Sequence, residues 1–209
     1  MPDKRRRLSQ IPLRTLLIWS AVLAAILLPL LLAAFSPLLQ WRQPVYIAAG
    51  FAGIFAMSLL LLQPLLAGGL LPGLQGLRAR RLHRWTGVLL VTAVTLHVAG
   101  LWITSPPDVI DVLLFRSPTP FSIWGVVAMW AVFLAALLAV FRRRLPLLPR
   151  NWRLAHAALA LTVVVGCVVH ALLIEGTMES ATKMLLSIAV VAVTLKVVLD
   201  LKIFTSRRS

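Results

Sequence analysis

The sequence predicts an all-α integral membrane protein, a bundle of six transmembrane helices with both chain termini in the cytoplasm. Of its 209 residues, 60% are hydrophobic and 13% are charged, whereas soluble domains are about half apolar and a quarter charged. Six apolar runs approach or exceed the roughly 20 residues that cross a bilayer. Basic residues gather in alternate connections, which orients the bundle.

The apolar runs define six expected spans, which are residues 13–35, 45–66, 82–103, 123–141, 152–174 and 184–201. The first run is about twice as long as the 7–15 residues of a signal-peptide core, so we expect it to remain as a helix. The two longest connections, 67–81 and 104–120, contain Gly or Pro and are predicted as turns. We divide the chain into a basic cytoplasmic tail (1–11), a membrane domain (12–203) and a cytoplasmic C-terminal tail (204–209).

Four clusters of basic residues precede the first span, open the third, separate the fourth from the fifth and follow the sixth. These positions share one side of the membrane, and the positive-inside rule makes that side cytoplasmic. The same clusters account for the net charge of +15. No nucleic-acid-binding module is recognisable, so we expect the lipid bilayer, and not nucleic acid, to be the partner of these charges.

The four histidines of the chain close two stretches of equal length, "HRWTGVLLVTAVTLH" (83–97) and "HAALALTVVVGCVVH" (156–170). Fourteen residues at about 100° and 1.5 Å each place both histidines of a stretch on one helix face, about 21 Å apart. The third and fifth spans run in the same direction. His83 and His156 therefore share one depth, and His97 and His170 share another. We call these the basic-end pair and the far-end pair.

Each pair is predicted to hold one iron from both sides, as two bis-histidine b-type hemes stacked across the membrane. A single intramembrane histidine also suits a packed polar residue, a proton relay or a helix-end anchor, although polar residues at this depth usually mark function. Zinc or copper accepts imidazole ligands as well. Neither metal explains two matched pairs about 21 Å apart, and no carboxylate or well-placed thiol completes such a site.

Other charged residues near the histidines are candidates for binding. Arg81, Arg84 and Arg153 are expected to pair with heme propionates, since guanidinium binds carboxylates well, or to be ordinary positive-inside charges. On the opposite side lie four acidic residues, Asp108, Asp111, Glu175 and Glu179. They suit ferric iron or a cationic partner, or they are solvated loop and helix-cap residues, and their roles stay open.

The segments "RRLHRWTGVLLVTAVTLHVAGLW" and "NWRLAHAALALTVVVGCVVHALLI" resemble the ferric reductase-like transmembrane domain superfamily. This superfamily includes ferric reductases, NADPH oxidases and the membrane heme subunit of the bacterial periplasmic methionine sulfoxide reductase system. The resemblance covers about residues 12–203. It implies heme ligation by His83 with His156 and by His97 with His170, and electron flow from the cytoplasm outward.

The sequence has no strand-linked G-x-G-x-x-G fingerprint of a nicotinamide or flavin domain, so it resembles the single-domain bacterial members. The expected function is that of an oxidoreductase component in the bacterial inner membrane, a diheme cytochrome. Its donor is a cytoplasmic flavoprotein carrying FMN or FAD, a reduced flavin or a quinol. Its acceptor is external, such as ferric iron. Two alternatives stay open: the electron-delivering heme subunit of a periplasmic oxidoreductase similar to the methionine sulfoxide reductase system, and a heme-free small transporter with a histidine proton relay.

Overall fold

The computed structural model describes residues 12–201, and the predicted tails 1–11 and 204–209 lie outside this range. The helices are α1 (Leu13–Ala34), the short 3-10 helix η1 (Pro37–Leu39), α2 (Pro44–Ala67), α3 (Gly76–Thr104), α4 (Pro106–Leu113), α5 (Ser122–Val140), α6 (Pro149–Leu173) and α7 (Ser180–Asp200). Six of them, α1, α2, α3, α5, α6 and α7, are long and apolar enough to cross a membrane. The predicted all-α bundle with six membrane spans is confirmed.

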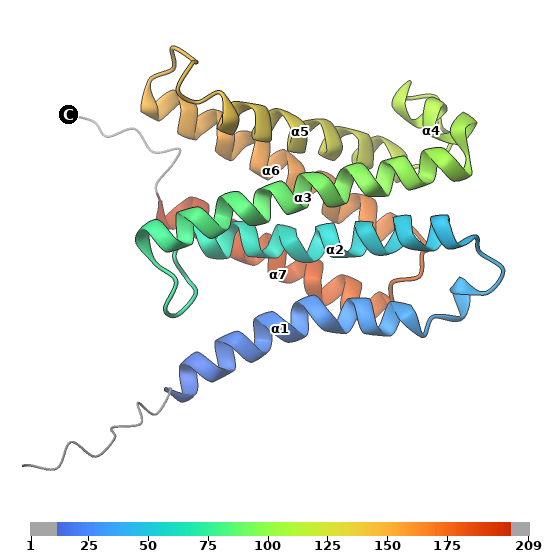
Figure 1. Cartoon of the computed structure of the whole chain (residues 1–209), viewed down its shortest axis with the longest axis horizontal. Helices are drawn as coiled ribbons and strands as arrows, with labels where there is room; N and C mark the ends of the chain where they lie inside the picture. Colours follow the sequence, from blue (N-terminus) through green and yellow to red (C-terminus); the bar gives the residue numbers. More distant parts are fainter. Residues whose placement is uncertain (1–11, 202–209) are drawn as a thin grey trace, which may run out of the picture.

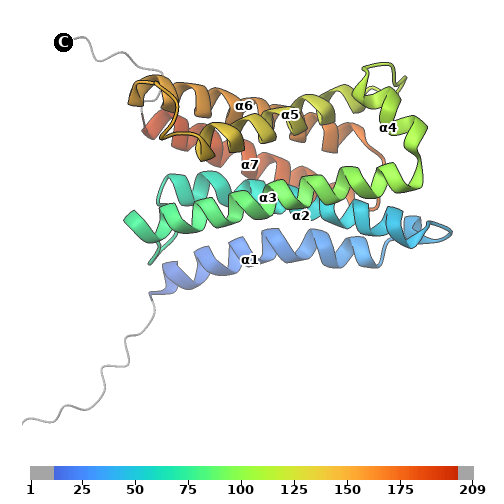
Figure 2. The same ribbon diagram turned by 45° about the horizontal axis from the view of Figure 1, so that its top comes forward.

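The long helices lie side by side as two antiparallel hairpins with α1 and α7 beside them (Figures 1 and 2). Helix α2 packs along α3, and α5 packs along α6, while α7 contacts both α2 and α6 and joins the hairpins. Helix α1 packs on α2 and α7. The start of α1 and the end of α7 lie at the same end of the bundle (Figure 1).

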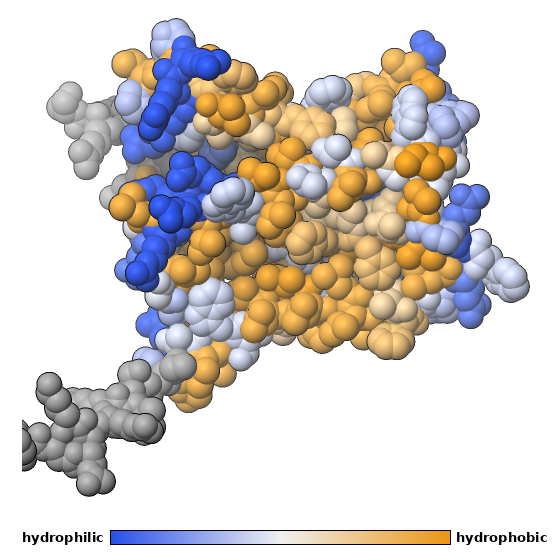
Figure 3. All heavy atoms as spheres, in the orientation of Figure 1, coloured by the Kyte–Doolittle hydropathy of each residue, from blue (hydrophilic) through white to orange (hydrophobic). Residues whose placement is uncertain are grey.

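The polar and apolar surfaces divide along the bundle axis. An apolar band covers the middle of the molecule, and hydrophilic residues gather where α3 begins and where α5 connects to α6 (Figure 3). We call this the basic end and the opposite one the far end. The banded surface and the six apolar helices identify an integral multi-pass membrane protein. Which compartment faces the basic end stays a prediction.

The two longest connections differ from their prediction as turns. Residues 104–120 contain α4, which begins at Pro106 and buries Val109. Proline is tolerated in the first turn of a helix, because the N–H that it lacks has no partner there. Helix α3 begins at Gly76, six residues before the predicted start. The intervening leucine, alanine and three arginines favour helix, but the charge of the arginines hides this segment from a search for apolar runs.

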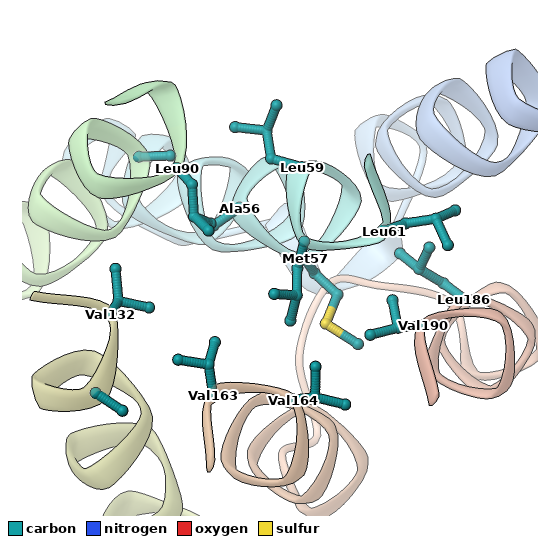
Figure 4. Close-up of a cluster of buried hydrophobic side chains, with 13 residues drawn as sticks. Ala56, Met57, Leu59, Leu61, Leu90, Val132, Val163, Val164, Leu186 and Val190 are labelled. Atoms are coloured by element: carbon teal, nitrogen blue, oxygen red, sulfur yellow. The ribbon is translucent and has the colours of Figure 1, made fainter. Parts of the chain in front are cut away.

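A layer of buried apolar side chains fills the space between the helices midway along the bundle. Leu90 on α3 and Val163 on α6 each lie seven residues from both histidines of their helix. In Figure 4 Met57 points from α2 toward Val164 and Val190. The layer also contains Val132 and Leu186, so α2, α3, α5, α6 and α7 all contribute to it. An apolar, close-packed layer therefore separates the two histidine pairs.

Small residues bring the hairpin helices close together. A Cβ on Gly100 of α3 would lie 2.8 Å from the Cβ of Ala49 on α2. A Cβ on Gly166 of α6 would lie 2.9 Å from the Cβ of Ala128 on α5. Close approach through small residues is the usual way in which membrane helices associate. It holds each histidine helix firmly against its neighbour.

Candidate functional site

The far-end histidines are each tied to the backbone of the neighbouring helix. The Nδ1–H of His97 donates to the carbonyl of Ala49 on α2 at 2.8 Å, and that of His170 donates to the carbonyl of Phe121, at the start of α5, at 2.9 Å. A carbonyl only accepts, so the proton sits on Nδ1 and Nε2 stays free. This is how proteins usually fix the tautomer of a metal-binding histidine. His97 and His170 lie near the far-end termini of α3 and α6.

A glycine lies against each far-end ring. A Cβ on Gly53 of α2 would lie 3.0 Å from Nδ1 of His97, and a Cβ on Gly125 of α5 would lie 2.7 Å from Nδ1 of His170. Any other residue would displace the ring or the helix. The ring orientation therefore depends on the absence of a side chain on the neighbouring helix.

The two far-end arrangements are copies of one motif. In each, the glycine follows the acceptor carbonyl by four residues, as Gly53 follows Ala49 and Gly125 follows Phe121. The acceptors and glycines repeat after 72 residues, and the histidines repeat after 73. The α2–α3 hairpin is thus repeated in α5–α6 at the far end of the bundle.

In the basic-end pair, only His83 has a hydrogen bond from Nδ1 to a backbone carbonyl of the neighbouring helix. The Nδ1–H of His83 donates to the carbonyl of Gln63 on α2 at 3.1 Å. Nδ1 of His156 is buried and has no hydrogen-bond partner within residues 12–201. The two rings face each other, with centroids 6.4 Å apart and planes at 72°.

Stacking replaces the missing hydrogen bond at His156. The ring of Trp152, one turn earlier on α6, stacks on the imidazole with centroids 5.1 Å apart and planes at 8°. The indole N–H of Trp152 donates to the carbonyl of Leu138 on α5 at 3.0 Å. The guanidinium of Arg142 lies 4.5 Å from the centre of the indole on the protein surface. Arg142, Trp152 and His156 thus form a stack from the surface to the histidine pair.

The separation of the basic-end rings suits one metal between them. Two imidazole nitrogens at about 2 Å from one metal place the ring centroids roughly 6 Å apart, close to the observed 6.4 Å. Among residues 12–201, no group of three or more His, Cys, Asp or Glu is placed to hold a metal ion. Structural zinc sites use four protein ligands. Two opposed histidines fit a metal whose remaining ligands come from a macrocycle.

The three arginines lie at different angles from the histidines. Arg81 and Arg84 line an open hollow of about 400 Å³ together with Trp85 and Val88. At 100° per residue, the centre of this face is turned roughly 160° away from His83. Arg153 is exposed and lies about 60° around α6 from His156. Their pairing with a carboxylate stays a prediction, and the angles favour Arg153 over Arg81.

The acidic residues at the far end have mainly local partners. Glu179 is the N-cap of α7, and its carboxylate accepts the backbone N–H groups of Ala181 and Thr182, both at 2.8 Å. These hydrogen bonds lower the pKa of Glu179. The Ser105 hydroxyl donates to Asp108 in the first turn of α4. Asp111 and Glu175 are exposed.

Gly53, Gly125 and the stack on His156 were not predicted as parts of the site. The glycines repeat at nearly the spacing of the histidines, which is a signal that the sequence contained. Trp152 lies four residues before His156 and so on the same helix face. The carbonyl acceptors could not be identified from the sequence, because every residue has a backbone carbonyl.

The family model for the ferric reductase like transmembrane component matches residues 49–167, more than half of the chain. The chain belongs to this family. The predicted resemblance is therefore confirmed, and membership indicates a component of transmembrane electron transfer. The match begins in α2, contains His83, His97 and His156, and ends three residues before His170. No curated protein and no solved structure matches the chain significantly.

Proposed function

We propose that the protein is a b-type diheme cytochrome that carries electrons from a donor at the basic end to an acceptor at the far end. The observation that carries the proposal is the 6.4 Å separation of the His83 and His156 rings. It is the spacing expected for two ligands on one iron, and a second pair lies fourteen residues along the same two helices.

His83 with His156, and His97 with His170, would each hold the iron of one heme. The Nδ1–H bonds of His83, His97 and His170 to backbone carbonyls leave Nε2 free to bind metal. When bound, heme supplies the one-electron chemistry, while the protein sets ligands and surroundings. Two histidines on one iron leave no open position, which favours electron transfer over oxygen binding.

The apolar layer at mid-depth has its own role in this proposal. Leu90, Val163 and their neighbours fill the space between the two pairs with close-packed side chains. The apolar side chains of the layer offer no hydrogen-bond partner to a water molecule or an ion, and the hydroxyls of Ser58 and Ser187 are buried beside it. Electrons need no continuous polar path, so the layer favours their passage over that of ions.

The direction of transfer follows from the charge distribution. Under the positive-inside rule the basic end faces the cytoplasm, in a bacterial inner membrane. A flavoprotein with FMN or FAD, a reduced flavin or a quinol delivers electrons there. Arg142 and Arg153 are exposed beside the basic-end pair and suit an anionic donor. Arg153 is the first proposed partner of the basic-end heme carboxylates, ahead of Arg84 and Arg81, whose common face is turned away from His83. The external acceptor is ferric iron.

An electron-delivering subunit of a periplasmic oxidoreductase would use the same path and differ only in its acceptor. Reduction of ferric citrate by the reconstituted protein alone supports the ferric reductase, whereas reduction that requires a co-purified partner supports the subunit. A heme-free transporter is tested by the absorption spectrum.

The decisive experiment is to quantify heme in the purified protein and in histidine variants. We expect a Soret band, a b-type α-band after dithionite reduction and two hemes per chain. His170→Ala should remove the far-end heme and leave most of the other, and His83→Ala should do the reverse. A wild-type spectrum without these bands refutes the heme proposal, and equal loss of both hemes in either variant refutes the pairing.

A further inference from the structure

A lysine is buried at the far end of the bundle. Lys183 lies in the first turn of α7, and its exposed fraction is 9%. Its Nζ donates to the carbonyl of Ile174 at 2.8 Å. An ammonium group carries three N–H donors, so this bond satisfies one of them.

Lys183 has no ion-pair partner within residues 12–201. The one ion pair between described residues joins Lys196 and Asp200 on the exposed surface of α7. Glu179 is close enough to Lys183 for the two charges to interact. Its carboxylate oxygens, however, accept hydrogen bonds from backbone N–H groups of α7 and form no ion pair with Lys183. Buried charges in proteins are normally paired, because removing an ion from water costs several kcal/mol.

The position of the ammonium relates it to the far-end histidines. Ile174 ends α6 four residues after His170, and its N–H donates to the His170 carbonyl at 3.2 Å. Four residues advance about 6 Å along a helix, and Lys183 Nζ lies 2.8 Å from the Ile174 carbonyl oxygen. The ammonium therefore lies about one turn beyond His170 along the bundle axis, toward the far surface.

We infer that Lys183 is the cationic contact for a carboxylate of the group held by His97 and His170, a propionate of the far-end heme. The inference rests on the proposed function. Heme carries two propionates, which belong at the edge of the site nearest to water. A carboxylate beside Lys183 would accept from its remaining donors and neutralise the buried charge. Lysine near a helix C-terminus also caps carbonyls, and the experiment separates this role from carboxylate binding.

The test is the midpoint potential of each heme in the purified holoprotein, measured by optical redox titration. Reduction adds negative charge, so a neighbouring cation raises the potential. Lys183→Met should lower the potential of the far-end heme by about 59 mV, a tenfold change in its reduction equilibrium. The basic-end potential should not move. Lys183→Arg should keep the wild-type value, and Lys196→Met, the control on the exposed face of α7, should change neither potential.

Binding of heme dimethyl ester, whose propionates are uncharged, tests the contact itself. In a His83→Ala background, which is expected to keep the far-end site alone, Lys183→Met should weaken the binding of heme but change the binding of the ester much less, as measured by titration of the apoprotein. Equal losses of affinity for heme and for the ester would show that Lys183 does not bind the carboxylate and would overturn the inference. So would an unchanged far-end potential in a Lys183→Met variant that retains both hemes.

Two further results keep the inference separate from folding and from the proposed function. If Lys183→Met does not fold, the far-end site of the wild-type protein must still bind heme more tightly than the ester, and equal affinities overturn the inference. Wild-type protein that binds no heme refutes the proposed function, which the titration reports before any variant is made.

Discussion

The far-end and basic-end histidine pairs occupy the same two helices but are held by different interactions. At the far end, a backbone carbonyl and a glycine of the neighbouring helix position each ring, once in each hairpin. At the basic end, a carbonyl positions His83, whereas stacking on Trp152 positions His156. The repeat is therefore preserved at one depth and broken at the other.

The difference shows that a hydrogen bond to Nδ1 specifies the orientation of a histidine ring more completely than stacking does. A hydrogen bond to Nδ1 fixes both the tautomer and the ring, and it makes the opposite nitrogen more basic. Stacking fixes the plane of the ring but leaves Nδ1 without a partner. We expect the far-end site to tolerate change poorly and the basic-end site to adapt more easily. The adaptable site is also the one beside the proposed donor surface.

The largest expected effect comes from filling the space beside a far-end ring. Gly125→Ala places a Cβ 2.7 Å from Nδ1 of His170, so the ring or α5 must shift, and the hydrogen bond from His170 to Phe121 is strained. Overpacking of this kind costs about 1–3 kcal/mol, and lost support of a ligand weakens binding by about 10–100-fold. Heme quantification should show selective loss of the far-end heme.

The matched control for this substitution is Gly50→Ala on α2. The nearest atom to its Cβ, the Thr177 hydroxyl oxygen, is 3.9 Å away, an ordinary contact. Gly50→Ala should retain two hemes. Full retention of the far-end heme in Gly125→Ala would show that this glycine does not position His170.

Removal of the stack at the basic end should have a smaller effect. An aromatic contact is worth about 0.5–1.5 kcal/mol, so Trp152→Leu should weaken the basic-end heme by at most about tenfold. Titration of the apoprotein with heme measures this change. Trp85→Leu is the control, because Trp85 is 63% exposed. If both variants bind heme equally well, Trp152 is an interfacial anchor only.

A modest effect is expected from the side-chain hydrogen bond beside His83. Gln63 Nε2 donates to the Thr86 hydroxyl at 2.9 Å, which links α2 to α3 next to the acceptor carbonyl. Thr86→Val should reduce the free energy of unfolding by about 1 kcal/mol. Thr95→Val is matched to it, because the Thr95 hydroxyl is exposed and bonds only within α3. Thermal melts of equal midpoint would contradict the role of this bond.

The smallest effect concerns the cap of α7. Hydrogen bonds from the backbone N–H groups of Ala181 and Thr182 lower the pKa of Glu179 in the folded protein. Its stabilising contribution is therefore complete above the pKa of the unfolded chain and disappears as the pH falls through the lower folded value. Glu179→Gln should lower the melting temperature slightly at pH 7 and no longer do so at strongly acidic pH. Glu175→Gln, at an exposed position, should change it at neither pH.

Much of the site was accessible from the sequence because helix geometry is local. The rise and turn of an α-helix fix the relative depth and face of His83 and His97, whatever surrounds them. Apolar length identifies the spans, and the quoted histidine segments carried the family resemblance that the family model confirmed. The common direction of α3 and α6 predicted that His83 and His156 lie at one depth, and their ring centroids are 6.4 Å apart; the pairing of His97 with His170 stays a prediction.

Only the tertiary structure decided how each histidine is held and which charges are buried. The partners of His97, His170 and His83 are backbone carbonyls, which the sequence does not distinguish from any others. Whether Gly53 or Gly125 meets a histidine depends on how α2 and α5 rotate against α3 and α6. Lys183 lies one residue before the predicted sixth span, and only the packing of α7 against α2 and α6 buries it. Such facts depend on contacts between residues far apart in the chain, which periodicity within one helix does not encode.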